Sequence, residues 1–276
     1  YLMKKILFLF WLISLLIATI YTYENPEKID SVKKYFKNKK APSLGISENQ
    51  GKISEKIEAN AFNVIFSKII SFPDEYRTAF VIYDDLNNNF NKEKIKIYSQ
   101  NGYKFFNTKY KRIPLPNVFT TDLNGGIKTI FTYKDNVFAL ISSLKNDCYY
   151  ASIIFLKDKS EIFKTKCLPD DNIDFNGLGS ANIHYKNKIL LSIGAPESIN
   201  SKIANLAQNK DSFFGKIIEI DKNNLDKIIS KKNKKIFPKI FSMGHRNPQG
   251  LTIMNENIFS VEHGPRGGDE LNKIIF

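Results

Sequence analysis

Apolar residues follow a distinct pattern in each part of this 276-residue chain, and the first pattern is a run without charge from Ile6 to Tyr23. Lys4 and Lys5 precede the run. A basic start followed by an apolar stretch is typical of an export signal, and the length is near the ~20 residues that span a bilayer. We therefore expect residues 1–23 to form a hydrophobic helix, either a signal peptide or a signal anchor with its lysines on the cytoplasmic side. Either reading places the rest of the chain outside the cytoplasm, periplasmic or membrane-anchored facing the periplasm.

The second pattern covers residues 24–77, which are charged and carry few large apolar side chains. This composition predicts a tether. Within it, residues 53–70 place apolar side chains at Ile57, Ala61, Val64, Ile65 and Ile69. That spacing favours one amphipathic helix.

The third pattern covers residues 78–276, where short β-rich runs such as "TAFVIYD", "NVFALISS" and "KILLSIG" alternate with turn residues. Strands at intervals of about 8–12 residues predict an all-β sandwich, barrel or propeller. Strand sets of about 40–50 residues suit propeller blades, and this length would build about four. The chain ends inside a strand pattern, and a propeller closes its ring to remove sheet edges. We expect residues 78–276 to be a partial β-propeller, incomplete at the C-terminus.

The overall composition changes this interpretation little. Hydrophobic residues make up 42% of the chain, enough for a packed core, and the net charge is +13. The lysines are spread along the chain and mostly accompany asparagine, and no helix or loop gathers them with interleaved aromatic residues, so we expect no nucleic-acid partner. Cys148 and Cys167 flank two expected strands in a register that sets them opposite each other. An exported protein could pair them as a disulfide, or they could remain two thiols.

Two polar clusters near the C-terminus carry the candidate chemistry: "GHRNPQG" from Gly244 and "EHGPRGGDE" from Glu262. Arg246 offers a planar fork of donors suited to a carboxylate or phosphate. In the second cluster the Gly-Pro step exposes backbone carbonyls beside several carboxylates, which are the hard oxygen ligands that Ca²⁺ prefers. Each cluster alone could also be a polar surface turn.

Taken together, "GHRNPQGL" and "EHGPRGGDELN" resemble the signature of the soluble quinoprotein sugar dehydrogenases, the glucose/sorbosone dehydrogenase family. The resemblance extends over about residues 176–276 and includes "AQNKDSFFGKIIEID" and "KILLSIG". It implies an all-β, six-bladed quinoprotein propeller that uses pyrroloquinoline quinone (PQQ) and Ca²⁺. It further implies that Arg246 and Asn247 face PQQ, that the carbonyls of Gly264 and Pro265 hold its calcium, and that Glu270 serves a second calcium site.

The implied function is oxidation of an aldose or related sugar to the lactone, with hydride transfer to the quinone and release of electrons to an external acceptor. Two departures weaken the catalytic part of this expectation. Asn176 stands where the family has its histidine base, and the nearest histidine, His184, lies eight residues later. Ala195 replaces the family's aspartate after "IG". The alternative is a non-catalytic propeller, stabilised by calcium, that binds a ligand or a protein partner.

Overall fold

The computed structural model describes the chain from the second half of the predicted tether onward. The described residues are 53–58, 63–67, 78–83, 95–106, 109–121, 124–169, 173, 175–196, 203, 205–264 and 268–275. The predicted hydrophobic helix over residues 1–23 lies outside them. In the described part, no helix is long and apolar enough to cross a bilayer.

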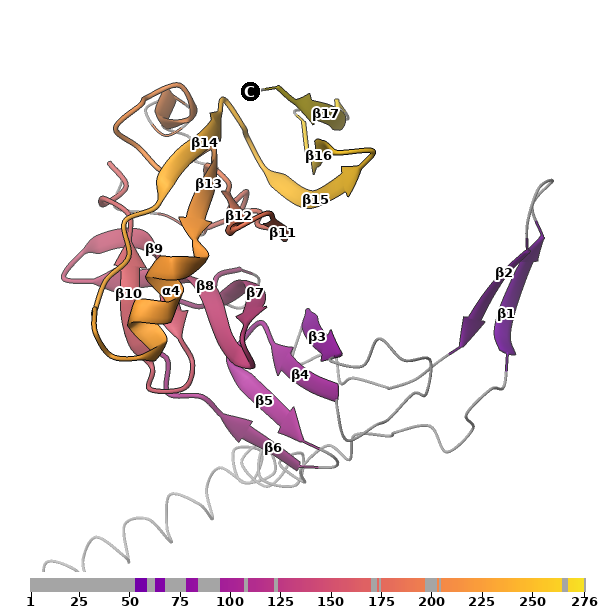
Figure 1. Ribbon diagram of the computed structural model, residues 1–276, viewed down its shortest axis with the longest axis horizontal. Coiled ribbons are helices and arrows are strands. Elements are labelled where there is room, and N and C mark those ends of the chain that lie inside the picture. The colour runs from indigo at the N-terminus through magenta and orange to yellow at the C-terminus, as the bar shows by residue number, and fades with distance from the viewer. Residues whose placement is uncertain are drawn as a thin grey trace, which may run out of the picture.

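Four antiparallel sheets follow one another along the chain in a propeller arrangement. Figure 1 shows them placed around an arc, in the order of the sequence. Within each sheet, neighbouring strands are also neighbours in the sequence. The blade 1 strands are β3 (Ala79–Tyr83), β4 (Ile95–Ser99), β5 (Tyr103–Phe106) and β6 (Lys109–Arg112). The blade 2 strands are β7 (Ile127–Tyr133), β8 (Asn136–Lys145), β9 (Cys148–Phe155) and β10 (Ser160–Lys164). The blade 3 strands are β11 (Asn182–Tyr185), β12 (Lys188–Ile193), β13 (Lys216–Asp221) and β14 (Lys239–Met243). The blade 4 strands are β15 (Pro248–Met254), β16 (Asn257–Glu262) and β17 (Glu270–Ile274).

The core lies between the faces of successive blades. Successive side chains of a strand point to opposite faces of its sheet. In β12, Ile189 and Leu191 accordingly pack into the cluster shared with blade 2, whereas Leu190 packs into the cluster shared with blade 4. In β8, Phe138 and Leu140 join the first of these clusters while Ala139 and Ile141 face blade 1. The middle strands are buried on both sides, which explains their continuous apolar sequences.

Tight turns connect the first two strands of blades 2 and 4. Lys134 and Asp135 join β7 to β8 with φ of 46° and 60°, and Asn255 and Glu256 join β15 to β16 with φ of 48° and 64°. Positive φ at both central residues matches the twist of antiparallel strands in two-residue hairpins. The polar turn residues expected from the sequence are thus confirmed here, and they fix the strand registers.

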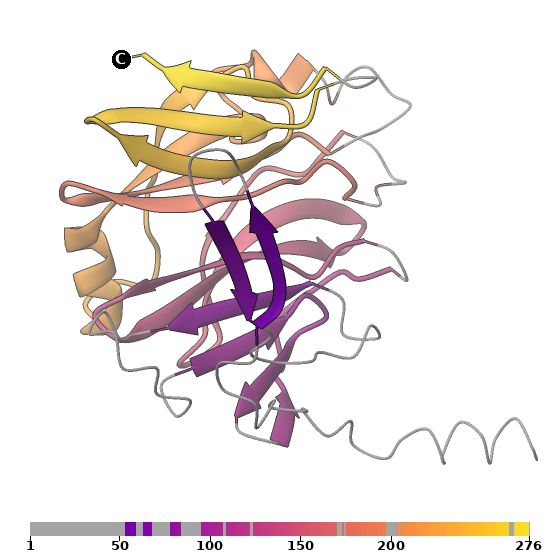
Figure 2. The same ribbon diagram turned by 90° about the vertical axis from the view of Figure 1, so that its right-hand side faces the viewer.

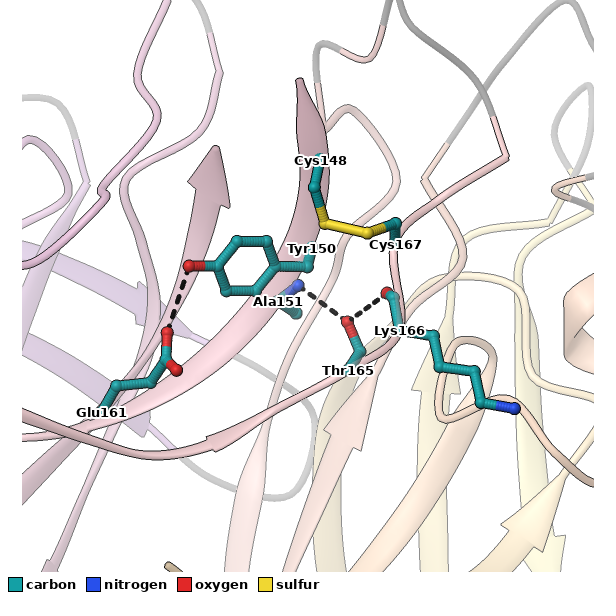
Figure 3. Close-up of a disulfide and its surroundings, with 7 residues drawn as sticks. All are labelled: Cys148, Tyr150, Ala151, Glu161, Thr165, Lys166 and Cys167. Atoms are coloured by element: carbon teal, nitrogen blue, oxygen red, sulfur yellow. Dashed lines mark hydrogen bonds between the residues drawn. A yellow bond between two sulfur atoms is a disulfide. The ribbon is translucent and has the colours of Figure 1, made fainter. Parts of the chain in front are cut away.

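Cys148 and Cys167 form a disulfide, so the first of the two possibilities left by the sequence is confirmed. The bond ties the start of β9 to the segment that leaves β10, with 5.2 Å between the two Cα atoms (Figure 3). The pairing continues beyond the strand, because the amide of Thr165 donates to the carbonyl of Ala151 at 2.9 Å and the Thr165 hydroxyl accepts from the Ala151 amide at 3.0 Å. The bond therefore closes the outer edge of blade 2.

The amphipathic helix predicted over residues 53–70 is wrong. Strands β1 (Ile53–Glu58) and β2 (Asn63–Ser67) pair there as an antiparallel hairpin, with Ile57 opposite Val64 and Glu58 opposite Asn63. The helical spacing was equally compatible with two short strands, and the β-branched residues of this segment favour the strands.

One helix in blade 3 was not expected. Helix α4 (Lys222–Ile229) joins β13 to β14 and is capped by Asp221, whose carboxylate accepts the Asn223 amide at 2.8 Å. A short 3-10 helix, η3 (Asn205–Ala207), precedes β13. Leu225 and Ile228 bury the inner face of α4 against blade 3. An Asp N-cap followed by apolar residues three and four apart was the available sequence signal.

Candidate functional site

Arg246 and Asn247 lie on the connection between blades 3 and 4, directly after β14. Gly244 starts the connection with φ of 91°, a conformation that favours glycine, and its amide donates to the Ala207 carbonyl at 3.0 Å. The next amide, of His245, donates to the Gly215 carbonyl at 3.1 Å. The chain therefore leaves β14 along a path that is pinned by two backbone hydrogen bonds.

The two polar clusters meet through the backbone. The amide of His263 donates to the carbonyl of Asn247 at 3.2 Å, and the amide of Arg246 donates to Glu262 Oε2 at 3.2 Å. We call the Arg246–Asn247 step the Arg-Asn corner. Gly264 follows directly after His263, which contacts this corner. The structure brings both clusters to one end of the blades.

A third segment of the resemblance, the end of β12, reaches the same place. The amide of Ala195 donates to the carbonyl of Arg246 at 2.8 Å, and the amide of Gly194 donates to the carbonyl of Gly179 at 2.9 Å. Gly179 in turn contacts Asn247, because a Cβ atom built on Gly179 would lie 2.1 Å from Asn247 Oδ1. Three other parts of the sequence thereby surround the Arg246–Asn247 step.

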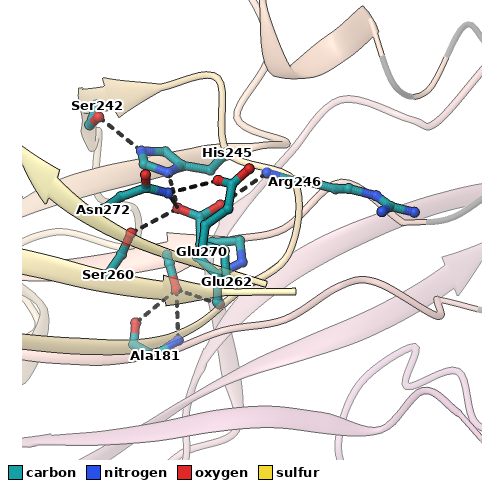
Figure 4. A network of polar contacts seen from close by, with 10 residues as sticks. Ala181, Ser242, His245, Arg246, Ser260, Glu262, Glu270 and Asn272 are labelled. Atoms are coloured by element: carbon teal, nitrogen blue, oxygen red, sulfur yellow. Dashed lines mark hydrogen bonds and ion pairs between the residues drawn. The ribbon is translucent and has the colours of Figure 1, made fainter. Parts of the chain in front are cut away.

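A buried carboxylate holds this arrangement together. Glu262 Oε1 accepts from the His245 ring at Nδ1 (2.5 Å) and from the Ser260 hydroxyl (2.8 Å), while Oε2 accepts the Arg246 amide (Figure 4). His245 Nε2 also contacts the Ser242 hydroxyl at 2.8 Å. Glu262 is only 3% exposed and His245 only 6%. A buried charge needs a partner and hydrogen bonds, and here the partners are the residues that carry the Arg-Asn corner.

The charge state of Glu262 follows from these contacts. Burial by itself would raise the pKa of the carboxyl, but the hydrogen bonds and charge of His245, with the Ser260 hydroxyl and the Asn272 amide, outweigh burial and lower the pKa below its usual value. Glu262 therefore stays ionised at neutral pH. The Arg246 side chain extends away from this network (Figure 4), and it is exposed.

Asn247 contains a polar atom that has no partner within the protein. Its Oδ1 is buried and accepts no hydrogen bond in the described part of the chain. Buried polar atoms are almost always satisfied, and an exception calls for a ligand or water as its partner. Since this atom belongs to the predicted cofactor-facing pair, a bound molecule with a donor group at this corner fits the residues present.

The loop that carries Gly264 closes on itself. A Cβ atom built on Gly264 would lie 1.6 Å from the Gly268 carbonyl oxygen, so only glycine fits there. Asp269 accepts from His263 Nδ1 at 3.1 Å and from the Gly264 amide at 3.3 Å. These bonds lower the pKa of the Asp269 carboxyl, the His263 contact being the largest cause. The carboxylate thus orients both the His263 ring and the turn.

The predicted calcium ligands are placed only in part. Pro265 lies outside the described residues. Glu270 begins β17, is exposed, and accepts from the Asn272 amide group at 2.9 Å. No group of three or more His, Cys, Asp or Glu side chains that could hold a metal occurs in the described ranges. The backbone carbonyl of Gly264, which the resemblance assigns to calcium, lies at this corner.

Asn176, at the family's base position, and His184, the nearest histidine, have different locations. Asn176 is exposed on the connection from β10 to β11, next to Gly177, whose carbonyl packs against Gly194. It therefore lies beside the Arg246 corner. His184 sits in β11 opposite Ile189 and near Lys222, where burial and that lysine lower its pKa. Lys222 starts the helix at the other end of blade 3, so the structure does not bring His184 to the cluster.

Sequence reasoning missed the residues that support the site. The alternation of β16 puts Ile258, Ser260 and Glu262 on one buried face, so a polar face within a core strand was the available signal for the network. Lys216 carried no such signal. It is fully buried, and its ammonium donates to the carbonyls of Leu206 (2.8 Å), Ala207 (2.7 Å) and Phe214 (3.0 Å). Ala207 accepts from Gly244 as well, so Lys216 supports the start of the Arg246 connection.

Comparison with known proteins agrees with this geometry. Residues 151–275 match the model of the Glucose / Sorbosone dehydrogenase family. This part of the chain is therefore similar to the glucose/sorbosone dehydrogenase family. The match begins within blade 2 and includes the Arg246–Asn247 step and the three segments that contact it, so the resemblance stated from the sequence is confirmed.

Two curated relatives of the family segment are informative. The chain is 42% identical over 72 residues to the uncharacterized protein slr1608 of Synechocystis, which is 25% of this chain and 18% of that protein. It is 37% identical over 68 residues to Quinoprotein glucose dehydrogenase B of Acinetobacter calcoaceticus, which is 23% of this chain and 14% of that protein. The aligned segments thus cover less than a fifth of either relative. No solved structure gives a significant match.

Proposed function

We propose that this chain is part of a PQQ- and calcium-dependent sugar dehydrogenase that oxidises an aldose or related sugar to the lactone. The observation that supports the proposal is the convergence of the two clusters, through the bond from the His263 amide to the Asn247 carbonyl. The match to the family model supports a small-molecule sugar substrate. The cofactor, the metal and the reaction are our inference from the residues at this corner.

Each residue at the corner has a chemical role in this proposal. Arg246 presents its guanidinium to a PQQ carboxylate, where a charge-assisted bond contributes about 1.5–3 kcal/mol. Asn247 uses its amide to position the quinone. The carbonyls of Gly264 and Pro265 hold the calcium ion, and Glu270 serves a second one. The bound quinone supplies the hydride-accepting chemistry.

Export, by the predicted segment of residues 1–23, is part of the same proposal. A periplasmic or membrane-anchored protein would pass its electrons to an external acceptor. The Cys148–Cys167 disulfide supports this location, because such bonds persist in oxidising compartments.

Binding and turnover can be measured separately to test the proposal. For binding, the protein would be titrated with PQQ in the presence of Ca²⁺ while the absorbance of the quinone is recorded. For turnover, it would then be assayed with aldoses and an artificial electron acceptor. We expect Arg246→Ala to weaken PQQ binding by about tenfold or more, whereas Lys239→Ala, on the outer part of the same blade, leaves it unchanged. PQQ affinity that is the same in Arg246→Ala and the parent would remove Arg246 from the site.

Calcium is tested by chelation. Removal of Ca²⁺ should lower the thermal midpoint of the PQQ-loaded protein, because a ligand that binds only the folded state stabilises it. A midpoint that does not respond to chelator would argue against a bound calcium ion.

The second candidate function is a ligand-binding propeller without catalysis. Asn176 favours it, since asparagine cannot accept the sugar's hydroxyl proton in place of the family's histidine. PQQ binding without turnover of any sugar in a broad panel would support this alternative.

A further inference from the structure

A hollow that shares no lining residue with the Arg246 corner is strongly basic. It has a volume of about 610 Å³ and lies between blades 1 and 2. Half of its fourteen lining residues are cationic, against a single carboxylate, Asp135. Six of the cations are Lys96, Lys104, Lys111, Arg112, Lys157 and Lys159, and Lys134 is the seventh. Lysine and arginine are only 41 of the chain's 276 residues, so this hollow concentrates them.

Most of these cations are not neutralised by neighbouring carboxylates. Lys134 is paired, since its ammonium lies 2.6 Å from Asp226 in α4. Lys111, Arg112, Lys157 and Lys159 are exposed and form no ion pair among the residues that the structure describes. Like charges gathered in a concave surface raise the local positive potential and attract anions.

The hollow follows the boundary between blades 1 and 2, from the turns at 134–135 and 157–159 of blade 2 to Ile113 and Pro114 on the connection between the two blades. The turns 134–135 and 157–159 join the first strand to the second and the third to the fourth within blade 2. In an antiparallel sheet these turns lie at one end, and the connections between blades lie at the other. Arg246 and Asn176 occupy connections between blades. Figure 2 shows α4, which carries the Asp226 partner of Lys134, at the left edge of the blades.

A neighbouring hollow extends the basic one. It has about 520 Å³ and shares Lys111, Arg112 and Lys159 with the first. Ile113 and Pro114 also line both hollows, and Val137 and Leu156 line the larger one. These volumes are in the range of pockets that bind small molecules.

We propose that this basic hollow binds a ligand carrying two or more phosphate groups. Its lining suits a ligand of high negative charge, because seven cations line it against one carboxylate. Lysine binds phosphate as a point charge, and the fork of arginine matches phosphate in bidentate geometry. The apolar residues between the cations accommodate the organic part of such a ligand. The phosphates come either from a soluble molecule or from the headgroups of an anionic lipid surface.

Isothermal titration calorimetry tests the proposal. The protein is titrated with sodium tripolyphosphate at physiological salt. We expect saturable binding that the double variant Lys111→Gln/Arg112→Gln weakens on the order of 100-fold, about tenfold for each charge-assisted bond removed. The matched control is Lys239→Gln/Lys273→Gln, which removes the same charge from exposed positions in blades 3 and 4. Circular dichroism would check that each variant keeps the parent's thermal midpoint.

A second arm distinguishes the two sources of phosphate. Vesicles of phosphatidylcholine, with and without phosphatidic acid, would be sedimented with the parent and both variants. Binding to phosphatidic acid vesicles that the Lys111/Arg112 variant loses assigns the ligand to a lipid headgroup, and tripolyphosphate binding without vesicle binding assigns it to a soluble molecule. The proposal is overturned by the absence of saturable binding in both arms. It is equally overturned by an equal loss in both double variants, which would show that only the net charge matters.

Discussion

Replacement of Glu262 tests whether the buried network organises the Arg246 corner. Four groups donate to its carboxylate: the His245 ring, the Ser260 hydroxyl, the Asn272 amide and the backbone amide of Arg246. In Glu262→Gln, one oxygen becomes an amide that faces at least one of these donors, and the negative charge is lost. A hydrogen bond to a charged group contributes about 1.5–3 kcal/mol. We therefore expect Glu262→Gln to lower the free energy of unfolding by about 2–3 kcal/mol.

Truncation of the same side chain should cost more. Glu262→Ala leaves all four donors without this acceptor, and removal of one partner of a buried pair costs about 3–5 kcal/mol. Urea unfolding followed by circular dichroism would measure both variants. The control is Glu219→Gln, because Glu219 pairs with Lys188 but the side chains are 17% and 41% exposed. A pair in which one partner reaches the solvent contributes about 1 kcal/mol.

The pH dependence gives an independent check on the charge of Glu262. Its pKa is lower in the folded than in the unfolded chain, so its stabilising contribution is present above the unfolded pKa and is lost as the pH falls through the folded value. The difference between the parent and Glu262→Gln should thus shrink below about pH 4. If Glu262→Gln and Glu219→Gln are equally stable at neutral pH, the network does not hold the corner and the reasoning fails.

Three further predictions concern residues around the site and the edge of blade 2. Burial lowers the pKa of Lys216 from 10.5 to about 8, so the unfolded chain binds more protons than the folded chain between these two pH values. The free energy of unfolding should therefore rise in this window by at most about 1.4 kcal/mol per pH unit, and a rise that persists in Lys216→Met would assign it to another group. The disulfide joins residues 19 positions apart, so its loss in Cys148→Ser/Cys167→Ser should lower the free energy of unfolding by about 3 kcal/mol. A reducing agent should destabilise the parent but leave this variant unchanged. Gly179→Ala would place a methyl group 2.1 Å from Asn247 Oδ1 and should weaken PQQ binding by about tenfold. The control is Gly250→Ala, whose added methyl group would meet its nearest neighbour at 3.4 Å and should leave PQQ binding unchanged. Equal PQQ affinities in the two variants would show that the position of Asn247 is unimportant.

Patterns that depend on neighbouring residues could be predicted from the sequence. The alternation of apolar runs and turn residues predicted the all-β architecture, and the blade-length spacing predicted a propeller, of which four sheets are seen. The register of the cysteines allowed either a disulfide or two thiols, and the structure shows the disulfide. The signature around Arg246 identified the segment that matches the family model. The helix over residues 53–70 failed because a short apolar segment can satisfy two periods at once.

The candidate site shows the limit of the sequence most clearly. The sequence determined which groups are available: a guanidinium at position 246, an amide at 247, a Gly-Pro step at 264, and an asparagine in place of a histidine at 176. Only the tertiary structure decided that the Arg246 backbone meets Ala195 and that Asn247 meets Gly179 and His263. It also decided that Glu262 is buried and that His184 lies elsewhere. Side-chain identity and spacing are local properties of the chain. Which distant segments share a hydrogen bond depends on how the blades pack face to face, and that packing is fixed by the whole core.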